Sequence, residues 1–426
     1  MRGNPKVQNP MFFVANTEER LAKDHPLRAI KRRADEVLKA MQRAFEDAYR
    51  ETGRPGIPPE ALLKALLLQA LSSIPSERRR VDALNWNLLY RWFCDLDPDQ
   101  AVCDATAFTH NRERFERHGL VQKFFERVVA TALVEQYASN DHFTVDGTLI
   151  QSWASLKSFR RKDEPADRPP TEGGRNPSVN FRGPKRANET HRSTTDPEAR
   201  LARKSDGQPA LLCHSGHAWM ENRHGLCLDI AIAVADGHAE RDTAEKLLRR
   251  FRRRHGVKPE TVSGDRGFEA GEFLRTLEED LDVMPHVPIT AERVTSPGPA
   301  GDARRRMLRR MKTKGYALSQ RARKKIEQMF GWMKQAGGLR KVRHVGRWKI
   351  QQVAYWWAAA FNRLRLAHRE AAREAEGRSG RRAETHNQPT RRIISSSTAL
   401  SFRTRSHPHL KNHPFCSILL GLGISL

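Results

Sequence analysis

The stretch HFTVDGTLI, residues 142–150, decides how the chain is divided. It alternates between side chains of different polarity and carries Phe, Val, Thr and Ile, a pattern typical of a β-strand. Inside this predicted strand lies one carboxylate, Asp146, which would be costly to bury as an unpaired ion. We predict that the strand begins a second domain and that the charge of Asp146 must be compensated there.

The chain upstream of this strand is predicted to be helical. From His25 to about Tyr137 the apolar residues recur at helical spacing, and the paired prolines of PPEALLKALLLQAL (58–71) suit the start of a helix. We predict four or five helices, the last of them over the long segment FERHGLVQKFFERVVATALVEQYA (115–138). Residues 1–137 are accordingly predicted to form an all-α N-terminal domain.

Downstream of the strand, a long loop precedes further strands and helices. Residues 160–210 hold seven prolines, several glycines and mixed charge, a composition too broken for regular structure. After it the pattern indicates a hairpin, a helix, a short strand with a Gly-flanked turn, a second helix, a short strand and two further helices. These are ALLCHSGHAWMEN with LCLDIAIAVADG (210–237), 239–255, ETVSGDRGF (260–268), a helix to about Asp280, DVMPHVP (282–288), the segment 323–334 and WKIQQVAYWWAAAFNRLRLAHREAAREAE (348–376). The turn carries a second carboxylate, Asp265.

A third carboxylate has unusually basic surroundings. Residues 301–350 contain 17 Lys plus Arg and only two acids, Asp302 and Glu327. Near Glu327, four apolar residues at i, i+3, i+4 and i+7 predict one buried helix stripe, with Arg323, Glu327 and Lys334 on a neighbouring stripe. The four are Ile326, Met329, Phe330 and Met333. Taken alone, Arg323 and Glu327 are equally well an ordinary ion pair on a solvated helix face, worth about 0.2–0.5 kcal/mol.

Composition restricts the partners of the protein. Lys and Arg outnumber Asp and Glu by 76 to 50, a net charge of +26 with a pI near 10.5, which is typical of proteins that bind polyphosphates. Five cysteines without paired spacing and an N-terminus without an apolar run favour the reducing cytoplasm. No strongly apolar stretch approaches the roughly 18–20 residues that span a bilayer, so we expect no membrane contact.

Three carboxylates in a basic chain suggest a metal site. Asp146, Asp265 and Glu327 would repel one another if the fold brought them together, and divalent cations remove that cost. Two Mg²⁺ held about 4 Å apart can activate a nucleophilic oxygen and stabilise the leaving oxygen of a phosphodiester. The order strand Asp, hairpin, helix, strand Asp, helix Glu is also that of the ribonuclease H-like fold. The pattern therefore favours an enzyme that cuts or joins nucleic acid strands.

Several blocks of the sequence resemble, in the same order, the DDE transposases of the bacterial insertion sequence 5 family. In the second domain these are HFTVDGTLIQSWASLKSF, GRNPSVNFRGPKRANETHRSTTDPEARL, GHAWMENRHGL, SGDRGF and RARKKIEQMFGWMKQAGGLRKVRH. Upstream, HPLRAIKRRADEVL and the region from PPEALLKALLLQAL to HNRERF are similar to the family's helical N-terminal domain. The resemblance covers about residues 5–370. It implies an α/β protein with a ribonuclease H-like mixed sheet flanked by helices, preceded by an all-α N-terminal domain.

The resemblance assigns roles to the three acids. By position, Asp146, Asp265 and Glu327 match the family's catalytic, metal-binding triad. The implied cofactor is a pair of Mg²⁺ ions, with Mn²⁺ as a substitute.

The same resemblance implies a DNA-binding role for the cations around Glu327. The family's Tyr, Arg, Glu, Lys signature is matched at Arg323, Glu327 and Lys334, but Gln320 stands at the tyrosine position. Gln can still hydrogen-bond a phosphate, and Tyr316 one turn earlier is a weaker candidate. Arg323 and Lys334 are expected to contact the DNA backbone rather than neutralise Glu327. The expected DNA-binding set is Gln320, Arg323, Lys334, Arg340, Lys341 and Arg343.

The predicted protein is a DNA transposase with three regions. It would bind the terminal inverted repeats of its element, hydrolyse a phosphodiester at each end and direct the freed 3′-hydroxyl at target DNA. Because element ends must be paired, the resemblance implies a homodimer or a larger synaptic complex, in the cytoplasm and associated with the nucleoid. The predicted regions are the helical domain 1–137, a ribonuclease H-like catalytic domain 138–372 that contains the 160–210 loop, and a disordered tail 373–426.

Two other functions and one other site are left open by the sequence. A ribonuclease H-like nuclease or resolvase would cut without strand transfer. A catalytically inactive relative would only bind DNA, and the tail after about 377, which does not resemble the family, is compatible with such a copy. Cys213, His214 and His217 are zinc-ligand types, but a closed zinc site needs four convergent ligands and the sequence has no second cluster.

The basic helices of the N-terminal domain are equally suited to reading DNA and to dimerisation.

Overall fold

The computed structural model of the 426-residue chain forms two compact units. The first contains Met1–Gln69 and Ile74–Arg114, and the second contains Ala70–Ser73 and Phe115–Leu426. The structure describes residues 16–49, 56–163, 186–205, 207–236, 239–295 and 297–386.

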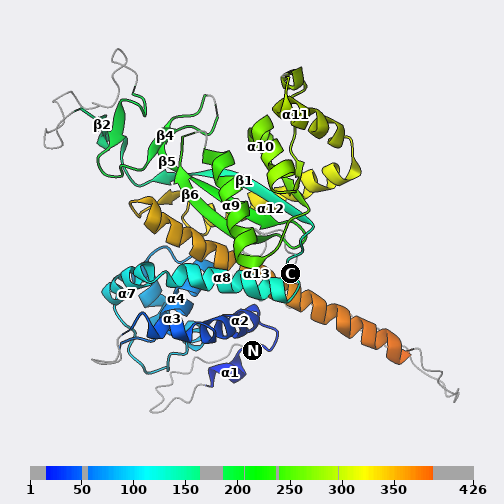
Figure 1. The fold of residues 1–426 in the computed structure, drawn as a ribbon. Coiled ribbons are helices and arrows are strands. Elements are labelled where there is room, and N and C mark those ends of the chain that lie inside the picture. Colours follow the sequence, from blue (N-terminus) through cyan, green and yellow to red (C-terminus); the bar gives the residue numbers. More distant parts are fainter. Residues whose placement is uncertain are drawn as a thin grey trace, which may run out of the picture. The chain divides into compact units, whose positions relative to one another are not determined.

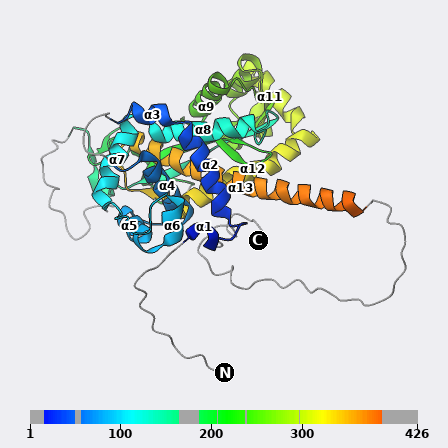
Figure 2. The ribbon, with the colours of Figure 1, turned by 90° about the horizontal axis from the view of Figure 1, so that it is seen from below.

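The first unit is built from helices, seen from below in Figure 2. They are α1 (Thr17–Arg20), α2 (Pro26–Lys39), α3 (Gln42–Glu46), α4 (Pro59–Leu71), α5 (Glu77–Trp86), α6 (Leu88–Phe93) and α7 (Ala105–Arg117). α2 begins with Pro26, and His25 Nδ1 accepts a hydrogen bond from the backbone N–H of Leu27 at 3.2 Å, which caps the helix. α5 and α6 lie side by side. The predicted all-α character of the N-terminal region is confirmed.

The long helix predicted over residues 115–138 is wrong, because the chain forms two helices there. α7 ends at Arg117, and α8 (Leu120–Val134) begins after Gly119, whose φ of 61° lies in the left-handed region. A residue with a side chain is strained in that conformation, so Gly119 breaks an otherwise helical pattern. The prediction of four or five helices is also too low, since the described chain has α2 to α8 between residues 26 and 134.

The second unit is centred on a mixed sheet. Its strands are β1 (His142–Ser152), β4 (Arg200–Ala202), β5 (Leu211–Glu221), β6 (Leu226–Val234), β7 (Thr261–Ser263), β8 (Met284–His286) and β9 (Lys341–Val342). β5 pairs antiparallel with β1 on one side and with β6 and β4 on the other. β7 runs parallel to β1, β8 runs parallel to β7, and β9 pairs in parallel with the end of β1. Three antiparallel strands followed by two parallel ones are consistent with a ribonuclease H-like fold, so the predicted fold class is confirmed.

Helices cover both faces of this sheet (Figure 1). Phe143 of β1 packs on Phe251 of α9 (Ala239–His255), with ring centroids 5.8 Å apart. Asp146 of the same strand pairs instead with Arg323 of α12 (Lys314–Gln335). Because neighbouring residues of a strand point to opposite faces, α9 lies on one face and α12 on the other. α13 (Arg347–His386) packs along β6 and against α8.

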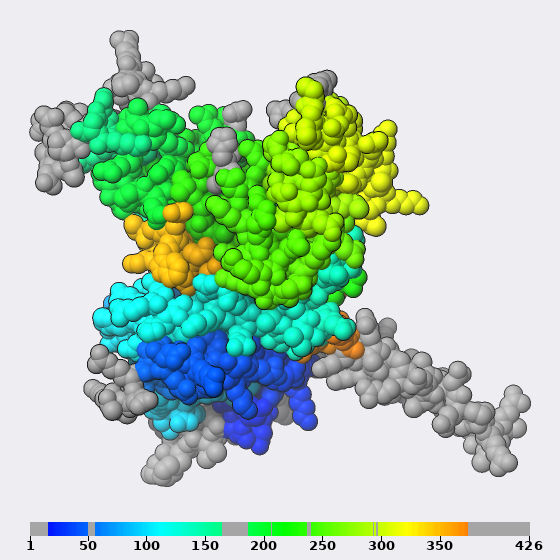
Figure 3. Space-filling view, in the orientation of Figure 1, coloured from blue at the N-terminus to red at the C-terminus, as the bar shows by residue number. Residues whose placement is uncertain are grey.

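Two helices beside β8 form a lobe that stands out in the space-filling view (Figure 3). They are α10 (Gly271–Arg275) and α11 (Pro299–Arg310), and they pack so closely that a Cβ on Gly271 would lie 2.4 Å from the backbone oxygen of Ala300. The helix predicted to reach Asp280 is α10 followed by a π-helical turn. The short turns of the second unit are η1 (Leu156–Ser158), η2 (Arg266–Phe268), η3 (Thr276–Asp280) and η4 (Ala291–Thr295).

The region predicted to be irregular, residues 160–210, contains short strands, and this part of the prediction is wrong. β2 (Phe159–Arg161) pairs with β3 (His191–Ser193), and β4 pairs with β5. Together they enclose a small core of Ala154, Phe159, Ala199 and Leu212. Local composition does not reveal such strands, because each is three residues long and is held by pairing with a distant segment. Residues 164–185 of the predicted loop lie outside the described residues.

α13 continues past the predicted end of its helix and reaches His386. The tail predicted over residues 373–426 therefore begins within a helix, and its part from 387 onward lies outside the described residues. In the part of the chain that the structure describes, no helix is both long enough and apolar enough to cross a membrane.

Candidate active site

Asp146 lies in the middle of β1, among charged groups. It is 9% exposed, and its Oδ1 accepts a hydrogen bond from the backbone N–H of Gly147 at 2.8 Å. Burial, together with the carboxylates of Asp265 and Glu327, raises the pKa of Asp146 to about 6, although the Gly147 N–H and Arg323 act in the opposite direction. The sheet thus places this carboxylate where its charge is costly unless a cation compensates it.

Asp265 lies just beyond the end of β7, the strand that pairs with β1. Its side chain caps the turn η2, because Oδ1 accepts a hydrogen bond from the backbone N–H of Gly267 at 2.8 Å. Gly264 makes room for the turn, since a Cβ there would lie 2.8 Å from the ring of Phe268. The parallel pairing of β7 with β1 brings Asp265 toward Asp146, although the two are far apart in the sequence.

Glu327 lies on α12, next to the buried stripe. The stripe is confirmed, because Ile326, Met329, Phe330 and Met333 are all buried. Arg323 Nη2 lies 3.3 Å from Glu327 Oε1, and Nη1 of the same guanidinium lies 3.3 Å from Asp146 Oδ2. Arg323 therefore joins a helical acid to a strand acid, which an ordinary pair on a solvated helix face would not do. Its pairing with Glu327 also differs from the expectation that Arg323 would leave that acid unneutralised.

The three predicted ligands approach one another without closing a metal site. Asp265 and Glu327 are near enough to Asp146 to raise its pKa. Among the described residues, however, no group of three or more His, Cys, Asp or Glu side chains is arranged to hold a metal ion. The donor set still fits Mg²⁺ or Mn²⁺, because carboxylate oxygens are the ligands that these cations prefer.

Gln320 is engaged within the protein. Its Nε2 donates hydrogen bonds to the backbone oxygen of Gly264 at 3.3 Å and to that of His286 at 2.6 Å. The amide therefore ties α12 to the ends of β7 and β8, directly before Asp265. Tyr316, one turn earlier, lies edge-on to the ring of His286. DNA contact at Gln320 stays a prediction, and the contacts that the structure gives this side chain are positioning ones.

The other predicted DNA-binding residues lie near the end of α12. Lys334 is half-buried, and burial together with the nearby cations Lys204 and Arg340 lowers its pKa. Arg340, Lys341 and Arg343 are exposed on the segment after this helix.

Sequence reasoning missed an aromatic side chain on this basic surface. Trp153 directly follows β1 and is 49% exposed. Lys341 Nζ lies 4.9 Å and the Arg343 guanidinium carbon 5.6 Å from the centre of its ring. Nothing in the local sequence marks Trp153, because its cationic neighbours come from β9 and the residue directly after that strand.

Sequence reasoning also missed a fourth carboxylate, Glu240, in the first turn of α9. A Cβ on Gly147 would lie 3.0 Å from its Oε1, and a Cβ on Gly267 would lie 2.9 Å from its Oε2. Burial and the charge of Asp265 raise the pKa of Glu240. No motif marks this residue, because an acid in the first turn of a helix is ordinary. Only the packing of α9 on β1 and η2 brings it to the site.

Cys213, His214 and His217 do not form a zinc site. All three are buried on β5, and His214 points to the opposite face from the other two, because strand residues alternate. His214 Nε2 lies 2.9 Å from Asp196 Oδ2, and His217 Nε2 lies 2.7 Å from Ser215 Oγ. Burial lowers the pKa of His217 to about 4, which keeps the ring neutral at pH 7.

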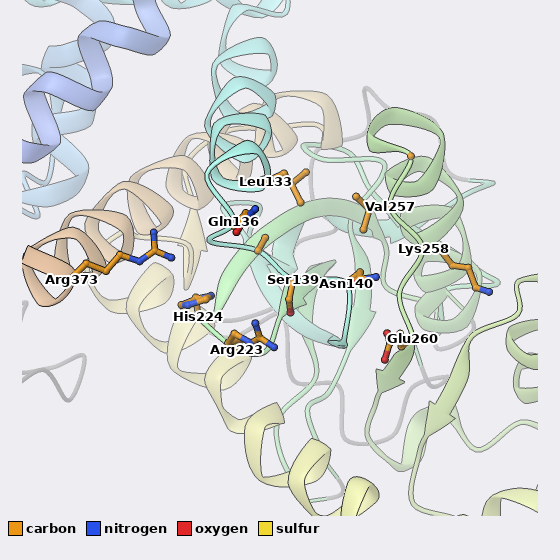
Figure 4. A pocket seen from close by; sticks show the side chains of 12 residues that line it. Leu133, Gln136, Ser139, Asn140, Arg223, His224, Val257, Lys258, Glu260 and Arg373 are labelled. Carbon is orange, nitrogen blue, oxygen red and sulfur yellow. The ribbon is translucent and has the colours of Figure 1, made fainter. Parts of the chain in front are cut away.

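A large hollow of the second unit lies away from these acids, at the start of β1 (Figure 4). Its volume is about 930 Å³, and Asn140, Arg223, Lys258, Glu260 and Arg373 are among its lining residues. None of the predicted site residues lines it. Because the hollow contains none of the three predicted ligands, the carboxylates, and not the hollow, mark the candidate active site.

Two protein families match the chain. Residues 15–114 match a family described as a transposase domain (DUF772), and residues 200–363 match a family described as a transposase DDE domain. Asp265, Glu327 and Glu240 lie inside the second match, whereas Asp146 precedes it. No curated protein and no solved structure matches the chain.

Proposed function

The chain belongs to the DDE transposases, and on this basis we propose that it cuts the ends of a DNA element and joins them to target DNA. The observation that carries this proposal is the shared guanidinium of Arg323, which pairs with Asp146 of β1 and Glu327 of α12. Asp265 is close enough to Asp146 to raise its pKa. Three acids that approach one another in a strongly basic chain suit phosphodiester chemistry on DNA.

Each acid has a separate structural support in the proposed site. Asp146, Asp265 and Glu327 would be ligands of the divalent cations of the site, Mg²⁺ or Mn²⁺. When bound, such cations activate the attacking oxygen and stabilise charge on the leaving oxygen. β1 fixes Asp146, the turn after β7 fixes Asp265, and the buried stripe of α12 aims Glu327. Arg323 is the counter-charge of two of the acids and, with a side chain 21% exposed, can also reach a DNA phosphate.

The proposed reaction consists of two displacements at phosphorus. In the first, water attacks the phosphodiester at an element end, a P–O bond to the water oxygen forms and the bond to the 3′-oxygen breaks. The products are a 3′-hydroxyl and a 5′-phosphate. In the second, that 3′-hydroxyl attacks a target phosphodiester and displaces the 3′-oxygen of the target strand. One bond forms and one breaks in each displacement, so strand joining needs no external energy source.

We propose that DNA contacts the exposed cations beyond α12. Arg340, Lys341 and Arg343 supply positive charge for the phosphate backbone. The exposed ring of Trp153, between two of these cations, offers a flat surface on which an unpaired base can stack. Lys334 is more buried, so it would add to the positive electrostatic potential of this surface and contact the nearest phosphate.

We also propose that the protein is a member of the insertion sequence 5 family and has the substrate and the assembly that membership implies. The collinear sequence blocks support this family among the DDE transposases. We further propose that the protein pairs the terminal inverted repeats of its element as a homodimer or a larger synaptic complex, associated with the nucleoid.

The proposal is tested with DNA that carries the inverted repeats flanking the gene. Asp146→Asn, Asp265→Asn and Glu327→Gln are each expected to abolish Mg²⁺-dependent cleavage while DNA binding stays within about twofold of the wild type, because phosphate contacts dominate affinity. Asp280→Asn, an exposed acid of the same unit, is the matched control and should cut at the wild-type rate. Retained Mg²⁺-dependent cleavage in any of the three variants would overturn the assignment.

A strand-joining assay separates the alternatives. A donor with a free 3′-hydroxyl should give a joined product with the wild type. Cleavage without a joined product would identify a nuclease or resolvase, and binding without cleavage would identify an inactive relative.

A further inference from the structure

We propose that Glu240 is a fourth carboxylate ligand of the divalent-cation site, and that with Asp265 it holds a cation position separate from the one formed by Asp146, Asp265 and Glu327. This inference rests on the proposed function, because it extends the same site. It also gives the paired cations of the proposed chemistry one set of ligands each, with Asp265 shared between them.

The carboxylate of Glu240 lies against the two segments that contain Asp146 and Asp265. Its Oε1 lies over Gly147, the residue after Asp146, and its Oε2 lies over Gly267, two residues after Asp265. A Cβ on either glycine would lie about 3 Å from a carboxylate oxygen of Glu240, so the carboxylate would have to shift. The position of the Glu240 carboxylate therefore depends on glycine at 147 and 267, close to the predicted ligands Asp146 and Asp265.

Asp265 is the acid whose charge acts on Glu240. Glu240 Oε2 and Asp265 Oδ1 lie 2.9 Å and 3.0 Å from one common point, the place that a Cβ of Gly267 would take. The two oxygens are therefore no more than about 6 Å apart, and a modest side-chain movement brings both within the ligand distance of about 2.1 Å that Mg²⁺ requires.

The two sets of ligands reach the site from opposite faces of β1. Asp146 points toward α12, where Arg323 and Glu327 lie. Gly147 points to the opposite face, toward α9 and Glu240, because residues of a strand alternate. Asp265 stands in the turn beyond the strand end, where it influences the charges of both Asp146 and Glu240.

One ring nitrogen of a buried histidine, Nδ1 of His217, lies near the same place and lacks a hydrogen-bond partner among the described residues. His217 pairs with Gly147 across β5 and β1, is fully buried, and its Nδ1 has no hydrogen-bond partner among the described residues. That atom lies 3.1 Å from the point where a Cβ of Gly147 would be, and Glu240 Oε1 lies 3.0 Å from the same point. A buried polar atom without a partner is uncommon and costly. A hydrated cation beside Glu240 would supply the missing hydrogen bond through one of its waters.

The carboxylates on the two sides of the site differ in whether a cation of the protein pairs with them. Arg323 neutralises Asp146 and Glu327 on the α12 face. In the described part of the chain, no ion pair reaches Glu240, although Arg241 follows it. A carboxylate that is half-buried next to a second carboxylate, without a paired cation from the protein, is suited to bind one from solution.

The test is a Mn²⁺ titration of the full-length protein, with free Mn²⁺ followed by electron paramagnetic resonance. The wild type should bind two ions. Glu240→Gln and Glu327→Gln should each bind one, the double variant should bind none, and Asp265→Asn should weaken both sites by about tenfold or more. Glu245→Gln, an exposed acid on the same helix that pairs with Arg249, is the matched control and should bind two.

The outcomes separate this inference from the proposed function. Two ions bound by Glu240→Gln with wild-type affinity would overturn the inference alone. Two ions bound by Asp265→Asn with wild-type affinity would overturn the proposed site as well. Gly147→Ala reaches the same carboxylate without changing a charge, because its Cβ would lie 3.0 Å from Glu240 Oε1 and 3.1 Å from His217 Nδ1 and would push both aside. It should weaken one of the two sites by about tenfold, and unchanged binding would count against the inference even if Glu240→Gln did not fold.

Discussion

Neutralising Asp146 should make the protein more stable while it destroys cleavage. Burial and the neighbouring carboxylates raise the pKa of Asp146 from its ordinary value of 3.8 to about 6. The folded chain therefore holds this proton more tightly than the unfolded chain does, so the free energy of unfolding falls as the pH rises from 3.8 to about 6, and above that range the full cost is present. At 1.36 kcal/mol per pKa unit the cost is about 3 kcal/mol. Asn keeps the shape of the side chain without its charge, and the pKa of about 6 already includes the attraction of Arg323, so Asp146→Asn should gain about 3 kcal/mol.

The assay is thermal unfolding of the full-length protein in EDTA at two pH values. At pH 7.5 the variant should melt about 6–12 °C above the wild type, because 1 kcal/mol is worth about 2–4 °C in a domain of this size. At pH 5 the carboxyl is mostly protonated in the folded chain and mostly ionised in the unfolded chain. About half of the cost is then already relieved in the wild type, and the advantage of the variant should fall to about 1.5 kcal/mol.

The control separates a local effect from a general loss of charge. Asp280→Asn removes an exposed carboxylate from the same unit and should change stability by less than about 0.5 kcal/mol. A variant of Asp146 that melts at or below the wild type at pH 7.5 would refute the reasoning. So would an advantage that does not shrink at pH 5.

Two further predictions concern the arginines that pair with buried acids. Arg323→Gln should slow DNA cleavage but tighten Mn²⁺ binding by about fivefold or more, because it removes a competing cation whose two ion pairs are worth about 1 kcal/mol each or less. Weaker Mn²⁺ binding, measured by the same resonance titration, would contradict this. Arg250→Ala should lower the free energy of unfolding by about 3–5 kcal/mol in urea, because it leaves Asp229, 2% exposed, as a buried unpaired charge. The matched change Arg249→Ala removes only an exposed pair and should cost less than about 1 kcal/mol.

The elements that could be predicted from the sequence are those with a sustained period. The strand at 142–150, the hairpin at 210–237 and the helix at 239–255 have enough residues for alternation or helical spacing to be read directly, and the structure has β1, β5 with β6, and α9 at these places. The buried stripe beside Glu327 follows from the same rule.

The errors arose where a single residue or a distant partner controls the backbone. Gly119 ends a helix by its left-handed φ, although the apolar pattern continues on both sides of it. β2, β3 and β4 have three residues each, too few for a period, and exist because another segment supplies their hydrogen bonds. Neither cause is visible in local composition.

The sequence by itself determined the order of the elements, the basic character of the chain and three separated acids that resemble a catalytic triad. Only the tertiary structure decided that Arg323 joins Asp146 to Glu327, and that Glu240 comes to lie beside Asp265. The reason is physical. Periodicity reports how one segment meets solvent and core, whereas these contacts depend on α9 and α12 packing on opposite faces of β1 and on the parallel pairing of β7, which no short stretch of sequence contains.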